Sequence, residues 1–377
     1  MGIIGAGFAS NIHAEAYKHV RSARVEILGV AAKELEEANA FKNKYSIEYG
    51  FDSAEKLLKT LGKDIDLIDI PVPTYLHAPM TILAAEEGKH IICESPMTGF
   101  FGENFQGVPS EAPRYLMLQQ TLKSVGEMEH AIRKNDVKYC YAENWVYAPP
   151  VVKARKLLAA VNAKILEIRG GASHSGSHSP YAYQWKYTGG GSLIQQGSHS
   201  IGAAIQLKHW EGLRVKDKFI HPESVVCEVG RLRKVASESQ GMKRNYFLGA
   251  PLDVEDWAGC FINFEDGSKA TINSGDCVLG GIQKILSVFA DTCRIHCNIN
   301  PNDVVLAYTP DKSLFEREYL IEKAETKEGW SSPQPDEAYM AGYYDEMEDF
   351  IQCVLNEDQR PLSGIEVASD CIKTIYA

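Results

Sequence analysis

Three small residues near the start of the chain have the types and spacing that bind a diphosphate. Gly5, Gly7 and Ser10 lie in the run Gly5-Ala6-Gly7-Phe8-Ala9-Ser10, a G-x-G-x-x-S variant of the dinucleotide fingerprint. Gly5 permits a tight turn, and Gly7 lets the backbone approach a pyrophosphate that lies at the N-terminus of the following helix. An ordinary glycine turn fits the same residues, but their place between an expected strand and an expected helix favours the dinucleotide. The sequence therefore predicts NAD or NADP as cofactor, with contacts from Gly5, Gly7, Phe8, Ala9 and Ser10.

The end of the second expected strand leaves the choice between NAD and NADP open. An acidic residue usually stands there and binds the ribose 2′-hydroxyl. Here the strand runs to Ala31, and Lys33 follows it. Lys33 would attract a 2′-phosphate and so favour NADP, but an ordinary solvated lysine at a strand end fits equally well.

Histidines, serines and aromatic residues gather in one stretch in the middle of the chain. His174 and His178 lie in the run Ser173-His174-Ser175-Gly176-Ser177-His178-Ser179, and Tyr181, Tyr183 and Trp185 follow. Hydroxyl and imidazole groups hydrogen-bond to sugar hydroxyls, and aromatic rings pack on the C–H faces of sugars. This loop is therefore a candidate site for a carbohydrate.

Two other interpretations of the same histidines stay open. His174, His178 and His199 would supply three nitrogen ligands to a metal ion, with Glu143 as a carboxylate ligand. Such spacing is common by chance, so we expect no bound metal and keep these residues only as the candidate ligands. A polar loop with solvated or hydrogen-bonded histidines is the third interpretation.

The elements that must position these residues fall into two groups, and the first covers residues 1–97. Short apolar strands alternate there with amphipathic helices, which predicts a doubly wound parallel sheet with right-handed crossovers. The expected strands are 1–4, 25–31, 67–70 and 90–93, and the expected helices are 9–20, 34–45, 53–61 and 79–87. Residues 98–114 are rich in glycine and proline and predict a surface insertion, before a helix over 115–134 and a strand over 138–142.

The second group has closely spaced strands. We expect helices over 150–160, 193–207, 338–355 and 364–376, and strands over 164–169, 224–230, 257–264, 269–275, 283–290 and 304–308. Short turns such as Glu265-Asp266-Gly267 indicate an open, mostly antiparallel sheet. The sequence thus predicts an α/β protein with a Rossmann NAD(P)-binding domain over 1–143 and a substrate-binding and oligomerisation α/β domain over 144–377. The acidic run Asp345–Asp349 fits a solvated helix face.

Composition excludes several classes of protein. The chain has 377 residues, 45% of them hydrophobic and 24% charged, and its net charge of −11 argues against a nucleic-acid partner. There is no 18-residue apolar run, and the first strand leads into glycines without a basic segment or cleavage site, so we expect neither a membrane span nor a signal peptide. The nine cysteines are scattered without a CxxC pair, which predicts buried reduced thiols in a cytoplasmic protein.

Five stretches of the chain together resemble the Gfo/Idh/MocA family of sugar oxidoreductases. The first is the fingerprint, and the others are Ile70-Pro71-Val72-Pro73-Thr74-Tyr75-Leu76-His77, Gly88-Lys89-His90-Ile91-Ile92-Cys93-Glu94-Ser95-Pro96, Gly189-Gly190-Gly191-Ser192-Leu193-Ile194-Gln195-Gln196-Gly197-Ser198-His199, and Glu255-Asp256-Trp257 through Phe264-Glu265-Asp266-Gly267. They are similar to the family's TPNxxH loop, its GKHVxCEKP strand, its GGGxLxDxGxH helix start and a sheet-forming ED…F.nG pair. The run from Tyr141 to Pro149 also resembles the family's crossover into the second domain.

The resemblance implies further cofactor contacts and an acid–base pair. The implied cofactor residues are Lys33, Pro71, Pro73, Thr74, His77, Glu94, Ser95 and Pro96. In the family the EKP lysine and the histidine at position 199 hold a sugar hydroxyl and take its proton while a hydride moves to the nicotinamide. Here Ser95 replaces the lysine, Gln195 replaces the aspartate of the fourth stretch, and Val146 stands where an arginine is frequent. Serine can hold a hydroxyl but is no unassisted base, whereas a histidine pKa of about 6.5 suits that role.

The sequence therefore predicts an NAD(P)-dependent oxidoreductase acting on a CH–OH group of a sugar, glycoside or cyclitol, with His199, Ser95 and His178 as catalytic residues. The expected substrate contacts are Asn144, His174, His178, Tyr181, Trp185, Gln195 and His199. Two rivals are a glycoside-cleaving enzyme that oxidises and re-reduces its sugar with bound NAD, and a non-catalytic NAD(P)-binding sensor. The resemblance also implies a homodimer or homotetramer formed through the open sheet face, and no nucleic-acid or membrane partner.

Overall fold

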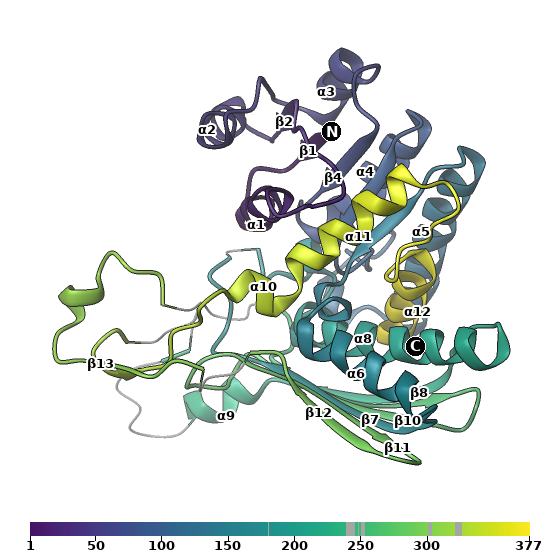
Figure 1. Cartoon of the computed structure of the whole chain (residues 1–377), viewed down its shortest axis with the longest axis vertical. Coiled ribbons are helices and arrows are strands. Elements are labelled where there is room, and N and C mark those ends of the chain that lie inside the picture. The colour runs from purple at the N-terminus through teal and green to yellow at the C-terminus, as the bar shows by residue number, and fades with distance from the viewer. Residues whose placement is uncertain (180, 239–245, 248, 250–252, 301–303, 321–325) are drawn as a thin grey trace. The chain divides into compact units, whose positions relative to one another are not determined.

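The computed structural model describes residues 1–179, 181–238, 246–247, 249, 253–300, 304–320 and 326–377 (Figure 1). The chain forms two compact units. The Rossmann unit consists of Met1–Val146, Lys186–Gly189 and Gly342–Ala377, and the second unit consists of Tyr147–Trp185 and Gly190–Ala341. Each unit is described by itself.

The Rossmann unit is built on a six-stranded parallel sheet in the order β3-β2-β1-β4-β5-β6. Its strands are β1 (Gly2–Ile4), β2 (Gly29–Ala31), β3 (Tyr49–Phe51), β4 (Leu67–Ile70), β5 (His90–Glu94) and β6 (Tyr139–Ala142). All five neighbouring pairs are parallel, and β1, β2, β4 and β6 are buried along their whole length. This order is that of a doubly wound dinucleotide-binding fold, so the predicted fold class of the N-terminal region is confirmed.

Helices connect these strands near the predicted positions. They are α1 (Phe8–Tyr17), α2 (Leu35–Tyr45), α3 (Ala54–Leu61), α4 (His77–Glu86) and α5 (Arg114–Lys134). Ser53 accepts a hydrogen bond from Lys56 N–H and so starts α3. The prediction missed β3 and made β2 too long, because a three-residue strand at a sheet edge carries no readable alternation.

The glycine- and proline-rich segment 98–114 is only partly a surface insertion. Thr98 and Phe100 have no exposed surface, and the Phe100 N–H donates to the hydroxyl of Tyr376. Most of residues 101–111 are half-buried or exposed. The predicted surface position is therefore wrong for residues 98–100, where the C-terminal helix covers the chain.

The end of the chain packs on the Rossmann unit, whereas the sequence-based boundary at residue 144 assigned it to the second domain. The expected single helix over 338–355 is divided by Gly342, at φ 100°, into α10 (Glu337–Ala341) and α11 (Tyr343–Leu355). Helix α11 contacts α1, and α12 (Ile365–Tyr376) contacts α5 and β6. Glu346 and Glu348 of α11 are buried, so the predicted solvated face over 345–349 is wrong at these two positions.

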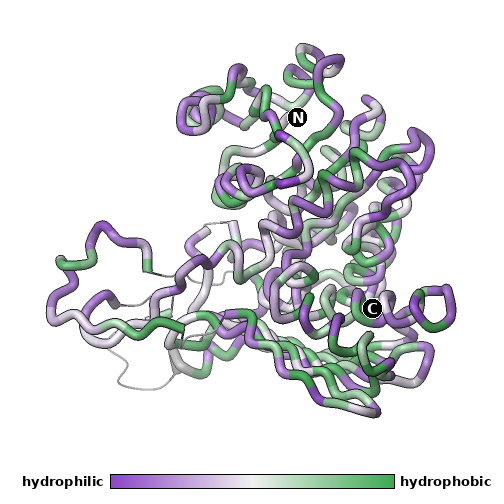
Figure 2. The backbone as a smooth tube through the Cα atoms, viewed as in Figure 1, coloured by the Kyte–Doolittle hydropathy of each residue, from purple (hydrophilic) through white to green (hydrophobic). Residues whose placement is uncertain are grey.

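The second unit contains a mixed six-stranded sheet in the order β12-β11-β7-β10-β9-β8. Its strands are β7 (Ile165–Ser173), β8 (Pro222–Gly230), β9 (Trp257–Phe264), β10 (Lys269–Gly275), β11 (Gln283–Ala290) and β12 (Arg294–Asn298). Only the β7–β10 pair is parallel among them, which confirms the mostly antiparallel sheet. Hydrophobic and hydrophilic segments alternate along these strands in Figure 2. The sequence analysis missed β12.

One face of this sheet is covered by helix α8 (Ser198–Lys216), which contacts β7 and β10. The other face exposes large apolar side chains, among them Val226, Phe261 and Ile285. Among the described residues, this unit also contains the helices α6 (Pro149–Ala160), α9 (Leu232–Glu238) and α10, and α7 (Trp185–Thr188) crosses the unit boundary. The strand expected over 304–308 is the shorter β13 (Ala307–Thr309), which pairs with β14 (Gly329–Ser331).

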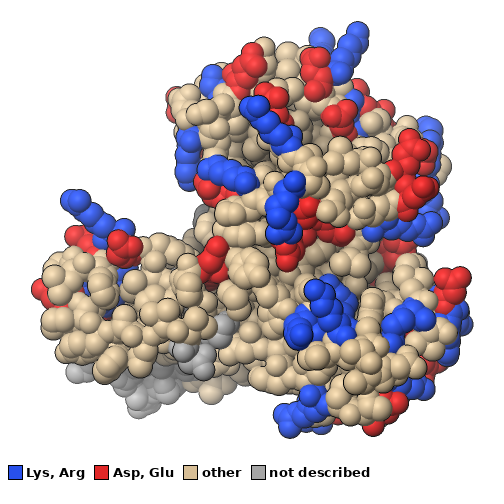
Figure 3. All heavy atoms as spheres, in the orientation of Figure 1, with Lys and Arg blue, Asp and Glu red and all other residues tan. Residues whose placement is uncertain are grey.

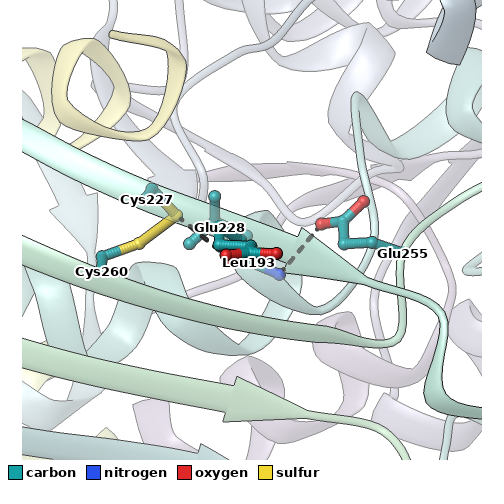
Figure 4. The surroundings of a disulfide bond; sticks show 5 residues. All are labelled: Leu193, Cys227, Glu228, Glu255 and Cys260. Atoms are coloured by element: carbon teal, nitrogen blue, oxygen red, sulfur yellow. Dashed lines mark hydrogen bonds between the residues drawn. A yellow bond between two sulfur atoms is a disulfide. The ribbon is translucent and has the colours of Figure 1, made fainter.

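Two cysteines depart from the prediction of reduced thiols. Cys227 of β8 and Cys260 of β9 face each other in the sheet register and form a disulfide (Figure 4). The other seven cysteines form no disulfide. The prediction is therefore wrong for this pair, because the sequence does not show which strands are neighbours. In the part of the chain that is described, no helix has the length and apolarity needed to cross a membrane.

Candidate functional site

The glycine fingerprint lies at the carboxyl end of β1, as the sequence predicts. Gly5 has φ 118°, and a side chain there would meet the Pro71 carbonyl oxygen at 2.7 Å. Gly7 is the N-cap of α1, and an added Cβ would meet no atom within 4 Å. Its N–H donates to Ser10 Oγ at 3.2 Å, and Ser10 is fully buried. The first turn of α1 holds no acidic residue, so its positive end remains available to an anion.

The neighbouring cofactor candidates surround the ends of β2 and β4. Phe8 is 69% exposed beside the fingerprint, and Lys33 is an exposed residue that follows β2. Pro71 is buried, and Pro73 and Thr74 start a single 3₁₀ turn before α4. These positions fit the predicted cofactor loop but do not distinguish NAD from NADP.

His77 ties this loop to the end of β5. Its Nδ1 lies 2.7 Å from the Pro96 carbonyl oxygen, and its Nε2 lies 2.8 Å from the Val72 carbonyl oxygen. Both ring nitrogens must donate, so the ring is an imidazolium. Burial by itself would lower the pKa of His77, but the Cys93 thiol and the two carbonyl groups outweigh burial and raise the pKa to about 9. Both nitrogens of His77 are thus engaged with the backbone.

A buried network that the sequence analysis missed lies behind Glu94 and Ser95. His13 of α1 places Nδ1 2.9 Å from Asp69 Oδ2 and Nε2 3.0 Å from Glu94 Oε1. Tyr17 donates its hydroxyl to Asp69 at 2.9 Å, and Ser95 N–H donates to Glu94 Oε2 at 2.9 Å. The signal was present, because Asp69 interrupts an apolar strand and His13 and Tyr17 lie one turn apart on the buried face of α1.

Acidic side chains surround this network. Burial by itself would lower the pKa of His13, but Asp69 and Glu94 outweigh burial and hold that pKa well above its usual value. Glu346 of α11 is fully buried, and neither of its carboxylate oxygens has a hydrogen-bond partner among the described residues. Burial, opposed by His13 and aided by Glu94 and other nearby carboxylates, raises the pKa of Glu346 well above its usual value. These effects favour the neutral form of Glu346, beside the charged groups of His13, Asp69 and Glu94.

Asn144 and Glu143, two further candidates, also lie in the Rossmann unit. Asn144 is buried in a 3₁₀ turn after β6. Glu143 has no exposed surface, and its Oε1 accepts from Trp145 N–H at 3.4 Å. The side chain of Glu143 thus belongs to the buried interior of this unit.

The histidine-rich loop follows β7 in the second unit. His174 is buried, and its Nδ1 accepts from Gly176 N–H at 3.0 Å and lies 3.2 Å from Asp276 Oδ1. Tyr183 accepts from Ser177 N–H at 2.6 Å and donates to the Ser177 carbonyl at 2.7 Å, which closes the loop. His178 is exposed, and Tyr181 is 46% exposed. Of these side chains, His178 and Tyr181 are accessible to a ligand.

Gln195 and His199 lie at the start of the longest helix of this unit. A π-helical turn, Leu193–Gly197, leads into α8, where His199 is the second residue. Such turns are frequent at functional sites. The Gln195 amide donates to the Ala182 carbonyl at 2.8 Å and to the Gly190 carbonyl at 3.1 Å. An aspartate in this place would have no N–H to donate, so Gln195 gives the loop a clamp that the family's residue does not provide.

Trp185 and residues 190–193 contact the segment 253–255. Trp185 is only 6% exposed, and its N–H donates to Asp253 at 2.7 Å, so its ring packs inside the unit. Glu255 Oε1 accepts from Leu193 N–H at 3.1 Å (Figure 4). A Cβ on Gly191 would lie 1.8 Å from the Glu255 carbonyl oxygen, so only glycine fits this position.

The candidate metal ligands are not brought together. Among the described residues, no group of three ligand atoms within 4.8 Å of one another includes His174, His178 or His199. On the face shown in Figure 3, the described acidic and basic side chains are interspersed.

Comparison with known proteins finds relatives of about half of the chain. Residues 1–107 match the model of the Gfo/Idh/MocA oxidoreductase family, described as an NAD-binding Rossmann fold. Levoglucosan dehydrogenase of Pseudarthrobacter phenanthrenivorans is 26% identical over 231 residues, or 55% of this chain and 50% of that protein. Mouse trans-1,2-dihydrobenzene-1,2-diol dehydrogenase is 26% identical over 195 residues, or 51% of each chain. The match thus spans about half the length of these curated relatives.

Solved structures extend the likeness of fold to the whole chain. GenD2 from gentamicin A biosynthesis, solved in complex with NAD, matches with a TM-score of 0.76 at 19% identity over 99% of this chain and 91% of that one. Myo-inositol 2-dehydrogenase from Lactobacillus plantarum matches with a TM-score of 0.71 at 19% identity over 99% of this chain and 94% of that one. The first 107 residues, with the fingerprint that they carry, are thus similar to the NAD-binding Rossmann fold of the Gfo/Idh/MocA oxidoreductase family.

Proposed function

We propose that the protein is an NAD(P)-dependent oxidoreductase that acts on a CH–OH group of a sugar, glycoside or cyclitol. The observation that carries this proposal is the open cradle at Gly7, above the N-terminus of α1, within a matched NAD-binding domain. The relatives named above include dehydrogenases of an anhydrosugar and of a cyclic diol. The cyclic polyol is therefore the substrate class to test first.

The residues of the chain fit the cofactor. The backbone of Gly5 and Gly7 and the first turn of α1 would hold the pyrophosphate, and Pro71, Pro73 and Thr74 would line the cofactor on the β4 side. When bound, the nicotinamide supplies the hydride acceptor. Lys33 is exposed at the place where a 2′-phosphate would bind, so both NAD and NADP belong in the first assay.

His199 is proposed as the acid–base residue. Oxidation of an alcohol removes a proton from oxygen as the hydride leaves carbon, so a base must reach the hydroxyl. Ser95 and Gln195 do not provide the ammonium and carboxylate groups of the family pattern, and the Gln195 amide is already engaged with two backbone carbonyls. His199, on α8 directly after a π-helical turn, is the remaining candidate, because a neutral imidazole nitrogen can accept a proton. Ser95, His178 and Tyr181 are proposed to hold substrate hydroxyls.

The test is a substrate panel run with His199→Asn and with a matched histidine variant elsewhere. His130→Asn is the control, because His130 is exposed on α5. Cyclic polyols, anhydrosugars and aldoses are assayed for reduced nicotinamide with NAD and with NADP. We expect His199→Asn to lower kcat by about 10²- to 10⁴-fold with unchanged cofactor affinity, and His130→Asn to leave both unchanged. Equal kcat in wild type and His199→Asn would remove His199 from the mechanism.

The two rivals predict different results in the same panel. Glycosides cleaved without net formation of reduced cofactor would indicate transient oxidation and elimination. Cofactor binding without turnover of any substrate, unaltered by Ser95→Lys, would indicate a sensor. Failure to bind either dinucleotide would contradict all three functions.

Assembly and location are part of the proposal. The uncovered sheet face, with Val226, Phe261 and Ile285 exposed, is proposed as the interface of a homodimer or homotetramer. A cytoplasmic site of action is proposed from the seven cysteines that form no disulfide. The Cys227–Cys260 disulfide is the observation against it. Native mass spectrometry reports the subunit number and any bound nucleotide in one measurement.

A further inference from the structure

The buried His13 connects two strand ends through its two ring nitrogens. Nδ1 lies 2.9 Å and 3.1 Å from the carboxylate oxygens of Asp69, and Nε2 lies 3.0 Å from Glu94 Oε1. A neutral ring would turn a lone pair toward one of these carboxylates, so both nitrogens must donate. The imidazolium thus forms charge-assisted bonds on both sides, and its side chain has no exposed surface.

The two carboxylates differ in how they are held. Asp69 lies within β4, is fully buried and also accepts the hydroxyl of Tyr17. Glu94 is the last residue of β5, its side chain is 16% exposed, and its second oxygen accepts from Ser95 N–H. Asp69 and Tyr17 therefore fix the ring, and the ring in turn fixes Glu94 and the backbone that follows it.

The position of Glu94 in the sheet indicates which part of the cofactor lies near it. The sheet order β3-β2-β1-β4-β5-β6 consists of two mononucleotide-binding halves, and ligands bind at the carboxyl ends of the strands. The glycine fingerprint follows β1, and Lys33, the position that reads the adenosine ribose, follows β2. The half formed by β4, β5 and β6 is therefore left for the nicotinamide mononucleotide.

We propose that His13 is a positioning residue, which holds the Glu94 carboxylate and the Ser95 backbone in the conformation that receives the nicotinamide half of the dinucleotide. This inference rests on the proposed function. It assigns no chemical step to His13, since the ring is buried and both of its nitrogens are engaged. Its role is to order the end of β5, and this order raises the affinity for a dinucleotide that carries the nicotinamide.

Four titratable groups surround the charged ring of His13. Asp69 of β4 and Glu94 of β5 bond to it, Tyr17 of α1 bonds to Asp69, and Glu346 of α11 lies close enough to interact electrostatically. The imidazolium thus lies between two carboxylates and offsets part of their negative charge. Removal of the cation would leave two anions facing each other, and Glu94 would then turn toward solvent.

The test compares the affinities for NADH and for ADP-ribose, which lacks the nicotinamide. His13→Asn keeps a donor where Nδ1 faces Asp69 but loses the donor to Glu94, whereas His13→Gln keeps a donor near the position of Nε2. We expect His13→Asn to weaken NADH binding about tenfold or more with ADP-ribose binding unchanged. His13→Gln should restore part of the difference, and His130→Asn should show none.

A second variant covers the case in which His13→Asn does not fold. Glu94→Gln changes a partly exposed residue at a strand end, and it should lower the NADH affinity relative to that for ADP-ribose to a similar degree. Where both variants fold, the double variant should lose no more than either single one, because the two residues act through one bond. Equal losses of both ligands, or an unchanged ratio in Glu94→Gln, would overturn the positioning role.

The same titrations separate this inference from the function on which it rests. Wild-type protein that binds neither NADH nor ADP-ribose would overturn both. Wild-type protein that binds both ligands, with an affinity ratio that does not respond to His13→Asn and Glu94→Gln, would overturn the role of His13 alone. No turnover is needed for either conclusion.

Discussion

The two units hold their candidate residues by different means. At the ends of β4 and β5 in the Rossmann unit, ionised side chains bond to one another, as His13 does with Asp69 and Glu94. At residues 189–199 of the second unit, the backbone does most of the holding, since Gly191 lies against the Glu255 carbonyl and Gln195 donates to two carbonyls. One region depends on charge and the other on close fit.

This difference predicts different responses to substitution and to pH. A buried charge network is sensitive to the loss or neutralisation of one partner. A close backbone contact is insensitive to pH but tolerates no added atom. Substitutions in the Rossmann network should therefore change how the unfolding free energy depends on pH. Substitutions at residues 189–199 should change the unfolding free energy equally at all pH values, according to the volume that they add.

The largest effect is expected at Gly191. In Gly191→Ala the new Cβ would lie 1.8 Å from the Glu255 oxygen and 2.7 Å from its carbonyl carbon. Backbone atoms cannot rotate away, so we expect a loss of about 3 kcal/mol or more in unfolding free energy. Thermal unfolding followed by circular dichroism measures it, and the loss should be the same at acidic and neutral pH.

A matched control is available in α5. Gly126 is exposed in that helix, and a Cβ there would meet nothing within 4 Å. Gly126→Ala should stabilise the protein by roughly 0.8–1 kcal/mol, since alanine is the better helix former. A Gly191→Ala protein as stable as Gly126→Ala would mean that close fit does not hold the second unit.

The same contrast explains what the sequence could predict. The fingerprint Gly5-Ala6-Gly7 and the order of apolar strands lie within a local stretch, so the Rossmann sheet and the place of the cofactor loop were readable. Contacts between distant segments could not be predicted, because the sequence does not show which elements are neighbours. The Cys227–Cys260 disulfide and the packing of α11 on α1 are two examples.

Site residues show the same limit. The position of His199 near a helix start followed from a motif, but the bonds of Gln195 to Ala182 and Gly190 depend on the fold of the loop. No sequence motif singled out His13, because its partners Asp69 and Glu94 lie on other elements. Glu346 looked solvated because an acidic run hides which residues face inward.

The second expected effect is a pH-dependent stability at His77. Its pKa in the folded protein is about 9, above the unfolded value of 6.5. A raised histidine pKa stabilises the fold fully below the unfolded pKa, and the stabilisation is lost as pH rises from 6.5 through about 9. The difference in stability between wild type and His77→Gln should therefore shrink by about 3 kcal/mol across this window. Denaturant unfolding at several pH values measures it.

The control for His77 is the exposed His130 of α5. His130→Asn should run parallel to wild type over the whole pH range, because its side chain is exposed. A His77→Gln profile parallel to wild type would show that the ring is neutral in the folded protein. The loop at Val72 and the Pro96 carbonyl would then depend on a single donor.

The smallest expected change in unfolding free energy has opposite signs for two neighbouring glutamates on α11. Burial raises the pKa of Glu346, whereas hydrogen bonds from the Arg21 N–H and from Gln352 outweigh burial and lower the pKa of Glu348. The folded state thus holds a proton on Glu346 that the unfolded chain releases, so stability falls as pH rises above 4.5. Glu346→Gln removes this term and should stabilise the protein at neutral pH by roughly 1–3 kcal/mol, with the gain vanishing near the pKa of an unfolded glutamate.

Glu348→Gln is the matched variant with the opposite sign. Its carboxylate accepts from Arg21 N–H at 2.5 Å and from Gln352 at 2.7 Å, so the stabilisation is present above pH 4.5 and is lost as pH falls through the lowered folded pKa. Glu348→Gln should therefore destabilise the protein at neutral pH, by about 1 kcal/mol, while Glu346→Gln stabilises it. Unfolding curves for both variants at neutral and acidic pH measure the two signs together. Equal signs would contradict the distinction between a buried carboxyl group without hydrogen-bond partners among the described residues and one that accepts hydrogen bonds.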